Sequence, residues 1–387
     1  MTYATMWTYP WDVLDEGVEK VVGFLREEVG LDAMSLTPAY HTYDQLRLHR
    51  PGPKLLSAYE DALYFRPELA RYRHTCIQPE VAPLTRDRDP LALISRQCRA
   101  RGLKLTLWTI GMHNHLQARR HPECALQGPF GDPYPGALCP ANPQVREYIR
   151  ALSTELTSRY EVDCIEYESL YYLGWGMFRN HAKVGVELGP VGRLLLSLCF
   201  CSHCRGRGAA AGVDVAGLQQ RVQGQLEGLF GGGRLAPELE THLAGEPELA
   251  ALLQVRAATV TSLVAELRAE VKTPISFLYM GDYHFNGIDT AAIEDQVDQV
   301  EILCYGNDPA QARAQAEAQR GQMAAPAKLL AGLSAFHPVA DLDTLRAVIG
   351  AVHAAGVRRF SYYNYGMIPQ QHFPWIREAL DEVRRHG

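Results

Sequence analysis

The sequence predicts a (β/α)8 barrel, an α/β fold in which parallel strands alternate with helices around a closed sheet. Short apolar segments recur eight times along the 387 residues, and segments with apolar residues at helical spacing separate most of them. The runner-up is an open doubly wound sheet, but no Gly-x-Gly-x-x-Gly turn follows the first apolar segment. We therefore expect a single barrel domain over residues 1–387.

The expected strands and helices alternate in order along the chain. The strands are 4–8, 32–37, 103–109, 162–167, 274–279, 299–304, 328–334 and 357–363. The clearest helices are 10–29, 90–101, 145–156, 247–271, 309–320, 341–355 and 375–383. Residues 169–245 break the alternation with an aromatic loop, cysteines and Gly-rich helical segments. This break predicts a subdomain inserted within the barrel after the fourth strand.

Composition and charge restrict the class of protein. The net charge of -6, with both signs mixed along the chain, predicts no basic face for nucleic acid. The sequence has no uninterrupted run of about 18 apolar residues, so no membrane span is predicted. The first residues lack the basic region and apolar core of a secretory signal, and the nine cysteines are irregularly scattered. We expect a cytoplasmic protein with reduced thiols, and a homo-oligomer remains open.

The fourth strand carries two carboxylates at its C-terminal end, where barrel enzymes form their pocket. Alternation along a strand places Cys164, Glu166 and Glu168 on one face, and Ile165 and Tyr167 on the other. The face that packs against helices is normally apolar, so both glutamates should point to the barrel axis or its mouth. A carboxylate there is costly unless it is paired or functional. The alternative is that one glutamate is buried in an ion pair and the other is solvated.

Aromatic and hydrogen-bonding side chains gather at the other strand ends. Rings that can stack on the C–H faces of a sugar, with polar groups for its hydroxyls, suit a carbohydrate substrate. The predicted substrate-binding residues are Trp7, Tyr40, His41, Trp108, His113, Tyr305, His337 and Asn364.

Hydrolysis of a glycosidic bond requires two carboxyl groups, so a second carboxylate is needed beside Glu166 or Glu168. Asp282, after the fifth strand, is the first choice, and Asp308, after the sixth, is the second. The alternative for Asp282 is a turn residue, because Asp is common in turns. On this basis we predict a glycoside hydrolase that uses a pair of carboxylates at the barrel mouth.

Two other functions fit the same strand ends. A catalytic divalent metal would make the protein a metal-dependent sugar isomerase, epimerase or hydrolase. Its candidate ligands are His41, His113, His115, His284, His337, Asp282 and Glu166, although no His-x-His spacing lies within a predicted strand. A barrel that binds carbohydrate without catalysis is the third possibility.

A cysteine cluster follows the fourth strand. Cys199-x-Cys201-x-x-Cys204 brings three thiolates within six residues, which suits one tetrahedral Zn²⁺ if a fourth ligand comes from elsewhere. Cys139 and Cys124, both after the third strand, are the candidates for that ligand, and His203 is a weaker choice. Coordination by protein ligands alone indicates a structural zinc. The alternative is a set of structural cysteines without metal.

Three blocks, at 138–149, 162–170 and 195–204, resemble a group of largely uncharacterised bacterial (β/α)8 barrels described as glycosidase-like, and the resemblance covers most of the chain. More distantly, the cysteines resemble those of zinc-carrying bacterial β-galactosidases, in which a cysteine after strand three and a Cys-x-Cys-x-x-Cys after strand four share a structural zinc. This resemblance implies Cys199, Cys201 and Cys204 as ligands, with Cys139 or Cys124 as the fourth.

The same resemblance bears on the catalytic carboxylates. Those β-galactosidases place their acid/base on strand four and their nucleophile on strand seven. Glu166 or Glu168 corresponds to the acid/base by position. The seventh strand here runs into Phe336 and His337 without a carboxylate, so the nucleophile has no counterpart.

Overall fold

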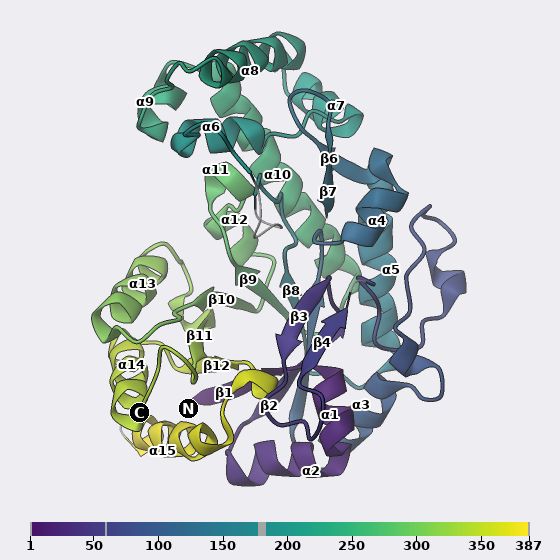
Figure 1. The fold of residues 1–387 in the computed structure, drawn as a ribbon, viewed down its shortest axis with the longest axis vertical. Coiled ribbons are helices and arrows are strands. Elements are labelled where there is room, and N and C mark those ends of the chain that lie inside the picture. Colours follow the sequence, from purple (N-terminus) through teal and green to yellow (C-terminus); the bar gives the residue numbers. More distant parts are fainter. Residues whose placement is uncertain (1, 59, 177–182, 386–387) are drawn as a thin grey trace.

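The computed structural model describes residues 2–58, 60–176 and 183–385. Residues 177–182 of the predicted insertion, and positions 1, 59 and 386–387 of the predicted domain, lie outside the described residues. Eight parallel strands close into a barrel in the order β1-β12-β11-β10-β9-β8-β5-β2 (Figure 1), which confirms the predicted fold. They are β1 (Tyr3–Thr8), β2 (Ala33–Ala39), β5 (Lys104–Ile110), β8 (Cys164–Glu168), β9 (Ile275–Tyr279), β10 (Gln299–Leu303), β11 (Leu329–Ser334) and β12 (Arg359–Tyr363).

Each barrel strand begins and ends within two residues of its predicted position, and helices lie between the strands. They include α1 (Pro10–Glu16), α2 (Val18–Gly23), α3 (Pro90–Ala100), α5 (Pro143–Arg159), α12 (Thr290–Glu294), α13 (Pro309–Gly321), α14 (Leu342–Ala354) and α15 (Phe373–Arg385). The single helix predicted over 10–29 is divided, because Gly17 adopts a φ of 98° between α1 and α2. A π-helical segment, Phe24–Glu28, continues α2.

Between β8 and β9 the chain forms a group of helices at one end of the molecule (Figure 1). These are α6 (Gly189–Leu196), α7 (Ser202–Ala210), α8 (Val215–Phe230), α9 (Leu239–Ala244) and the long α10 (Pro247–Glu270). The short α11 (Tyr283–Asn286), which follows β9, joins the same group. They enclose a second apolar core, which includes Leu195, Leu218 and Leu226. A ribbon of β6 (Ala125–Gln127) and β7 (Pro133–Leu138) reaches this group, because Phe200 N donates to Gln127 O at 2.8 Å.

Helix α10 links the two cores. Leu252 near its start belongs to the second core, whereas Val260 and Leu263 further along belong to the barrel core. By length and composition alone this helix is apolar enough to cross a membrane, with a mean hydropathy of 1.3 over its most apolar window. Half of that window is buried inside the protein, as in a core helix of a soluble domain.

A hairpin of β3 (Tyr43–Leu46) and β4 (Leu55–Ala58), in a segment for which no strand was predicted, contacts the start of α1. Trp11 Nε1 donates to Gln45 Oε1 at 2.6 Å. Arg47 Nε lies 2.9 Å from Asp12 Oδ1, and these two side chains are only 3% and 4% exposed. The hairpin therefore depends on a buried ion pair next to the end of β1.

Replacing Arg47 with Met should lower the free energy of unfolding by about 3 kcal/mol, because Asp12 would lose its buried cation. Denaturant unfolding of the whole chain measures the change. Arg313→Met is the matched control: Arg313 pairs with Glu317 in an exposed i,i+4 ion pair, so its loss should change stability by less than about 0.5 kcal/mol. Equal effects of the two substitutions would contradict the role assigned to the buried pair.

Candidate functional site

Three glutamates point into the barrel. Glu166 and Glu168 lie on β8 and Glu301 lies on β10, with exposed fractions of 1%, 8% and 0%. Tyr167, between the first two, is turned the other way and is fully buried in the apolar core outside the barrel strands. The alternation along β8 thus places both of its glutamates on the inner face, as the sequence predicts. Within the described part of the chain, none of the three forms a salt bridge.

Neutral donors from neighbouring strands surround the deeper pair. Glu166 Oε1 accepts from Trp7 Nε1 at 2.5 Å and from Ser35 Oγ at 3.3 Å. Glu301 accepts from Ser361 Oγ, and its charge is affected by that of Glu166. Burial raises the pKa of Glu166, although its donors oppose this. Burial, followed by the charge of Glu166, raises the pKa of Glu301 well above its ordinary value.

Glu168 lies at the end of β8, where the barrel opens. Its Oε2 accepts from Trp108 Nε1 at 2.6 Å. Burial raises the pKa of Glu168 to about 7; the Trp108 hydrogen bond lowers it and the charge of Glu166 raises it. A carboxyl group that holds its proton near neutral pH can act as a general acid.

Aromatic rings enclose the glutamates at the mouth of the barrel. The hydroxyl of Tyr9 lies 2.9 Å from that of Tyr40 and 3.0 Å from that of Tyr363. The centroid of Trp108 is 5.1 Å from Tyr40 and 5.8 Å from Trp7. These contacts hold a wall of rings over β1, β2, β5 and β12.

The wall has a more open edge at the ends of β10, β11 and β12. Tyr305 is 37% exposed, and its centroid is 5.7 Å from that of Tyr363. The centroid of Phe336 is 6.3 Å from that of Tyr363, and both residues are half-buried. This edge provides ring surface that solvent can reach beside the enclosed carboxyl groups.

The structure brings some predicted substrate-binding residues together and leaves others apart. Trp7, Tyr40, Trp108 and Tyr305 all lie around the glutamates. His41 lies behind them, with its ring 4.3 Å from that of Tyr40 and 4.1 Å from that of His113 between centroids. Burial lowers the pKa of His113 to about 2, so its imidazole is neutral.

The last two predicted binding residues have other surroundings. His337 is exposed in the loop after β11. Asn364 is fully buried after β12, and its Oδ1 accepts from Gly366 N at 3.1 Å. That contact holds the backbone turn after β12.

Both aspartates considered as the second carboxylate cap helices. Asp282 Oδ1 accepts from Phe285 N at 2.8 Å at the start of α11. Asp308 Oδ1 accepts from Ala310 N at 2.9 Å at the start of α13. Both residues are exposed. Capping accounts for an Asp at each position without catalysis, and a catalytic role for Asp282 stays a prediction.

Sequence reasoning missed Glu301 and Tyr9. Glu301 occupies the middle of a predicted strand, between Val300 and Ile302, whereas the search for site residues concentrated on strand ends. A lone carboxylate inside an apolar strand was the available signal, because such a group needs a partner when buried. Tyr9 directly follows β1 and had no distinguishing pattern around it.

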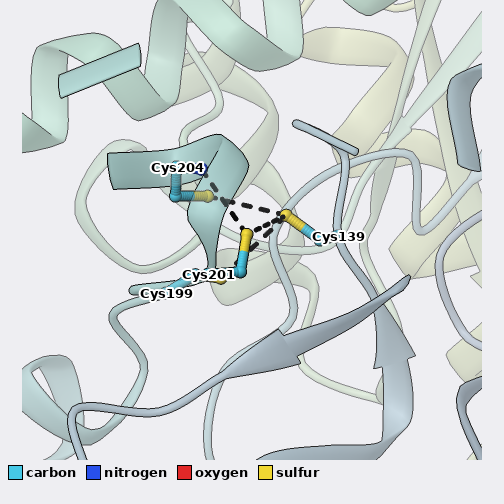
Figure 2. Close-up of side chains that lie close together, drawn as sticks. All are labelled: Cys139, Cys199, Cys201 and Cys204. Carbon is cyan, nitrogen blue, oxygen red and sulfur yellow. Dashed lines mark hydrogen bonds between the residues drawn. The ribbon is translucent and has the colours of Figure 1, made fainter. Parts of the chain in front are cut away.

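The cysteine cluster is compact and buried (Figure 2). Cys139 Sγ lies 3.5 Å from Cys204 Sγ, 3.6 Å from Cys201 Sγ and 3.9 Å from Cys199 Sγ. All four sulfurs lie within 4.8 Å of one another. Cys124, the alternative fourth member, instead has its sulfur 3.7 Å from that of Cys76. The structure therefore groups Cys139 with the other three.

A buried arginine lies close to the cluster. Arg256 of α10 is 2% exposed, and its guanidinium is 4.6 Å from the centroid of the Tyr172 ring. Tyr172 Oη is 3.4 Å from Cys204 Sγ. Arg256 donates to three carbonyl oxygens, at Ser197, His284 and Phe285, and within the described residues it forms no salt bridge.

Comparison with solved structures shows that several glycoside hydrolases share this barrel fold. No protein-family model and no curated protein sequence matches the chain. Among solved structures, the glycoside hydrolase domain of PgaB (BpsB) from Bordetella bronchiseptica is similar over 98% of this chain and 99% of its own, with a TM-score of 0.62 and 12% identity.

Two further enzymes are similar over 99% of this chain. The β-galactosidase of the psychrophilic Marinomonas ef1 has a TM-score of 0.58 at 14% identity, and this chain covers 59% of it. The α-L-fucosidase isoenzyme 2 of Paenibacillus thiaminolyticus has a TM-score of 0.56 at 14% identity, and this chain covers 49% of it. At these identities the likeness is one of fold.

Replacing Trp108 with Phe should raise the pKa of Glu168 further, because the carboxylate would lose the N–H that stabilises its charge. NMR titration of protein with ¹³C-labelled glutamate carboxyl groups measures this without a substrate. Trp11→Phe is the control, since the Trp11 indole donates to Gln45 and to none of the three glutamates. If the titration midpoint of Glu168 stays unchanged or falls in Trp108→Phe, the stabilising role assigned to the Trp108 hydrogen bond is contradicted.

Proposed function

We propose that this protein is a glycoside hydrolase in which Glu168 protonates the leaving group. The proposal is carried by the exposure, the raised pKa and the fixed position of the Glu168 carboxyl group. It is the most exposed of the three inward glutamates, its pKa is raised to about 7, and its carboxyl group is fixed by Trp108. The similarity of the fold to glycoside hydrolase barrels supports the same class of reaction.

The proposed reaction follows from the placement of the charges. Protonated Glu168 donates its proton to the glycosidic oxygen as the bond to the anomeric carbon breaks, and the leaving group keeps the bonding electron pair. Positive charge then develops on the sugar ring. The negative charge held by Glu166 deeper in the barrel favours that transition state over the neutral substrate. Water then adds its hydroxyl group to the anomeric carbon, and its remaining proton goes to the Glu168 carboxylate, which restores the acid.

The aromatic edge suits a sugar as the bound group. Tyr305, Phe336 and Tyr363 offer partly exposed ring surface at the ends of three adjacent strands. Sugar C–H faces stack on such rings. The deeper rings of Trp7 and Trp108 are occupied in binding the glutamates and hold the carboxyl groups in place.

We also propose that Cys139, Cys199, Cys201 and Cys204 hold one structural Zn²⁺. Four sulfurs arranged tetrahedrally about 2.3 Å from zinc are about 3.8 Å apart. The distances from Cys139 Sγ to the other three, 3.5 to 3.9 Å, fit that spacing. Zinc bound by four thiolates leaves a net negative charge. Arg256 is a nearby buried cation without a carboxylate partner among the described residues, and it suits that charge.

The metal-dependent alternative has less support. In residues 2–58, 60–176 and 183–385, the groups of three or more side chains with ligand atoms within 4.8 Å of one another are built on cysteines and contain no histidine. His41 and His113 stack face to face and do not converge on one point. We therefore place the chemistry on Glu168 and the metal in the cysteine cluster.

Glu168→Gln should reduce kcat/KM by roughly 100-fold or more on a glycoside with an alkoxide leaving group, because such a group needs a proton to leave and the amide cannot donate it. A panel of aryl glycosides first identifies a substrate for the wild-type protein. Binding of the corresponding free sugar should persist in the variant. Asp282→Asn is the matched control, since Asp282 caps α11.

The outcomes of this comparison distinguish the functions. An equal loss of turnover in Asp282→Asn would identify Asp282 as the second carboxylate. Sugar binding without turnover of any glycoside would favour the non-catalytic barrel. Activity that a chelator abolishes while the fold stays intact would contradict the present mechanism and favour a catalytic metal.

The purified protein should contain one Zn²⁺ per chain by elemental analysis, and Cys139→Ser should lose it. Loss of zinc should lower the unfolding temperature, because the ion joins β7 to the start of α7. Cys124→Ser is the matched control and should keep the metal, since the Cys124 sulfur faces Cys76. Zinc retained in Cys139→Ser and lost in Cys124→Ser would reverse the assignment of the fourth ligand.

A further inference from the structure

Glu166 of β8 and Glu301 of β10 both point into the barrel, and each acts on the charge of the other. Neither has a salt-bridge partner among the described residues, and two ionised carboxylates repel each other and only accept hydrogen bonds. The two residues are 1% and 0% exposed, and two bare negative charges at this depth would be strongly disfavoured. The two residues therefore form a pair that holds a proton.

The donors around the pair indicate where the negative charge resides. Glu166 Oε1 accepts from Trp7 and Ser35, whereas Ser361 is the one donor to Glu301 among the residues that the structure describes. Oε2 of Glu301 is buried, and no donor of the described residues faces it. Hydrogen bonds favour the charged form of the carboxyl group that receives more of them. This arrangement favours negative charge on Glu166 and a proton on Glu301.

The neighbouring groups leave the negative charge on Glu166 and the proton on Glu301. The side chains that face the pair or affect its charge come from every side of the barrel, namely Tyr3, Trp7, Ser35, Trp108, Cys164, Glu168, Ser276, Tyr305, Arg359 and Ser361. Burial raises the pKa of Cys164, Tyr3 and Tyr305, so these groups are neutral at neutral pH. Arg359, the cation of this set, has its guanidinium 4.6 Å from the centroid of the Tyr3 ring.

We propose that Glu166 and Glu301 share one proton, that the pair carries one negative charge, and that this charge helps to keep a proton on Glu168. Glu168 follows Glu166 by two residues on the same face of β8. Glu301 is then a positioning residue that acts through Glu166. The shared proton is independent of any reaction, and only its consequence for catalysis rests on the proposed function.

Infrared spectroscopy of the full-length protein tests the shared proton directly. At mildly alkaline pH, where Glu168 has lost its proton, a carboxylic-acid C=O band should remain and shift in D₂O. Glu168→Gln should keep that band. Glu301→Gln should lose it, because the amide is neutral and of similar size but carries no carboxyl proton. Absence of the band in the wild-type protein, or its persistence in Glu301→Gln, would overturn the proposal.

NMR titration of ¹³C-labelled glutamate tests the effect on Glu168. Glu301→Gln leaves the charge on Glu166, so the midpoint of Glu168 should stay close to the wild-type value. The double variant Glu166→Gln/Glu301→Gln has no charge at the pair, and the midpoint should shift to lower pH. A double variant that is folded by circular dichroism but keeps the wild-type midpoint would refute the coupling.

These measurements separate the inference from the proposed function. Neither requires a substrate, so both hold if no glycoside is turned over. If a glycoside is turned over, the alkaline limb of kcat/KM should move to lower pH in the double variant, in step with the NMR midpoint. A change in overall rate without a shift of that limb would indicate that the pair acts only on the structure.

Discussion

Three carboxyl groups are buried together inside one closed barrel, and the structure around them has to compensate for the water that they lose. A buried carboxylate loses its hydration and must recover hydrogen bonds from the protein. Here the donors are neutral side chains from separate strands: Trp7 of β1, Trp108 of β5 and Ser361 of β12. Neutral donors stabilise the charge only in part, so burial still raises the pKa of the acids. A cation in their place would have held Glu168 ionised and unable to donate a proton.

The sequence predicted the barrel well because the spacing of apolar residues in its strands and in its helices is a local pattern. A strand of five to seven residues and the helix after it can be recognised without knowledge of their partners. The same holds for the inward face of β8 and for three of the clustered cysteines. The partners of Glu166 could not be predicted in this way, because Trp7 is 159 residues away along the chain and meets it only when the barrel closes. Glu301 was missed for another reason, because it lies in the middle of a predicted strand and site residues were sought at strand ends.

Asp282 illustrates a different limit of sequence reasoning, in which a local pattern admits two meanings. An Asp after a strand can reach into the mouth of a barrel or cap the next helix, and both occur where a strand ends. The structure adds the hydrogen bond to Phe285 N, which accounts for the residue through the short helix α11. The β3–β4 hairpin was missed because its strands are short and its stability comes from Asp12 and Trp11, which lie outside it.

The raised pKa of Glu168 also couples the stability of the fold to pH. Its ordinary pKa is 4.5, and burial raises it to about 7 in the folded chain. Between these values the folded state binds more protons than the unfolded state, so stability falls as pH rises. The destabilisation is absent below the ordinary pKa and complete above the raised one. The barrel therefore loses stability over the pH range in which its acid loses the proton that the proposed reaction needs. A Gln at this position would remove both the loss of stability and the chemistry, which is the conflict between stability and activity expected of a catalytic group.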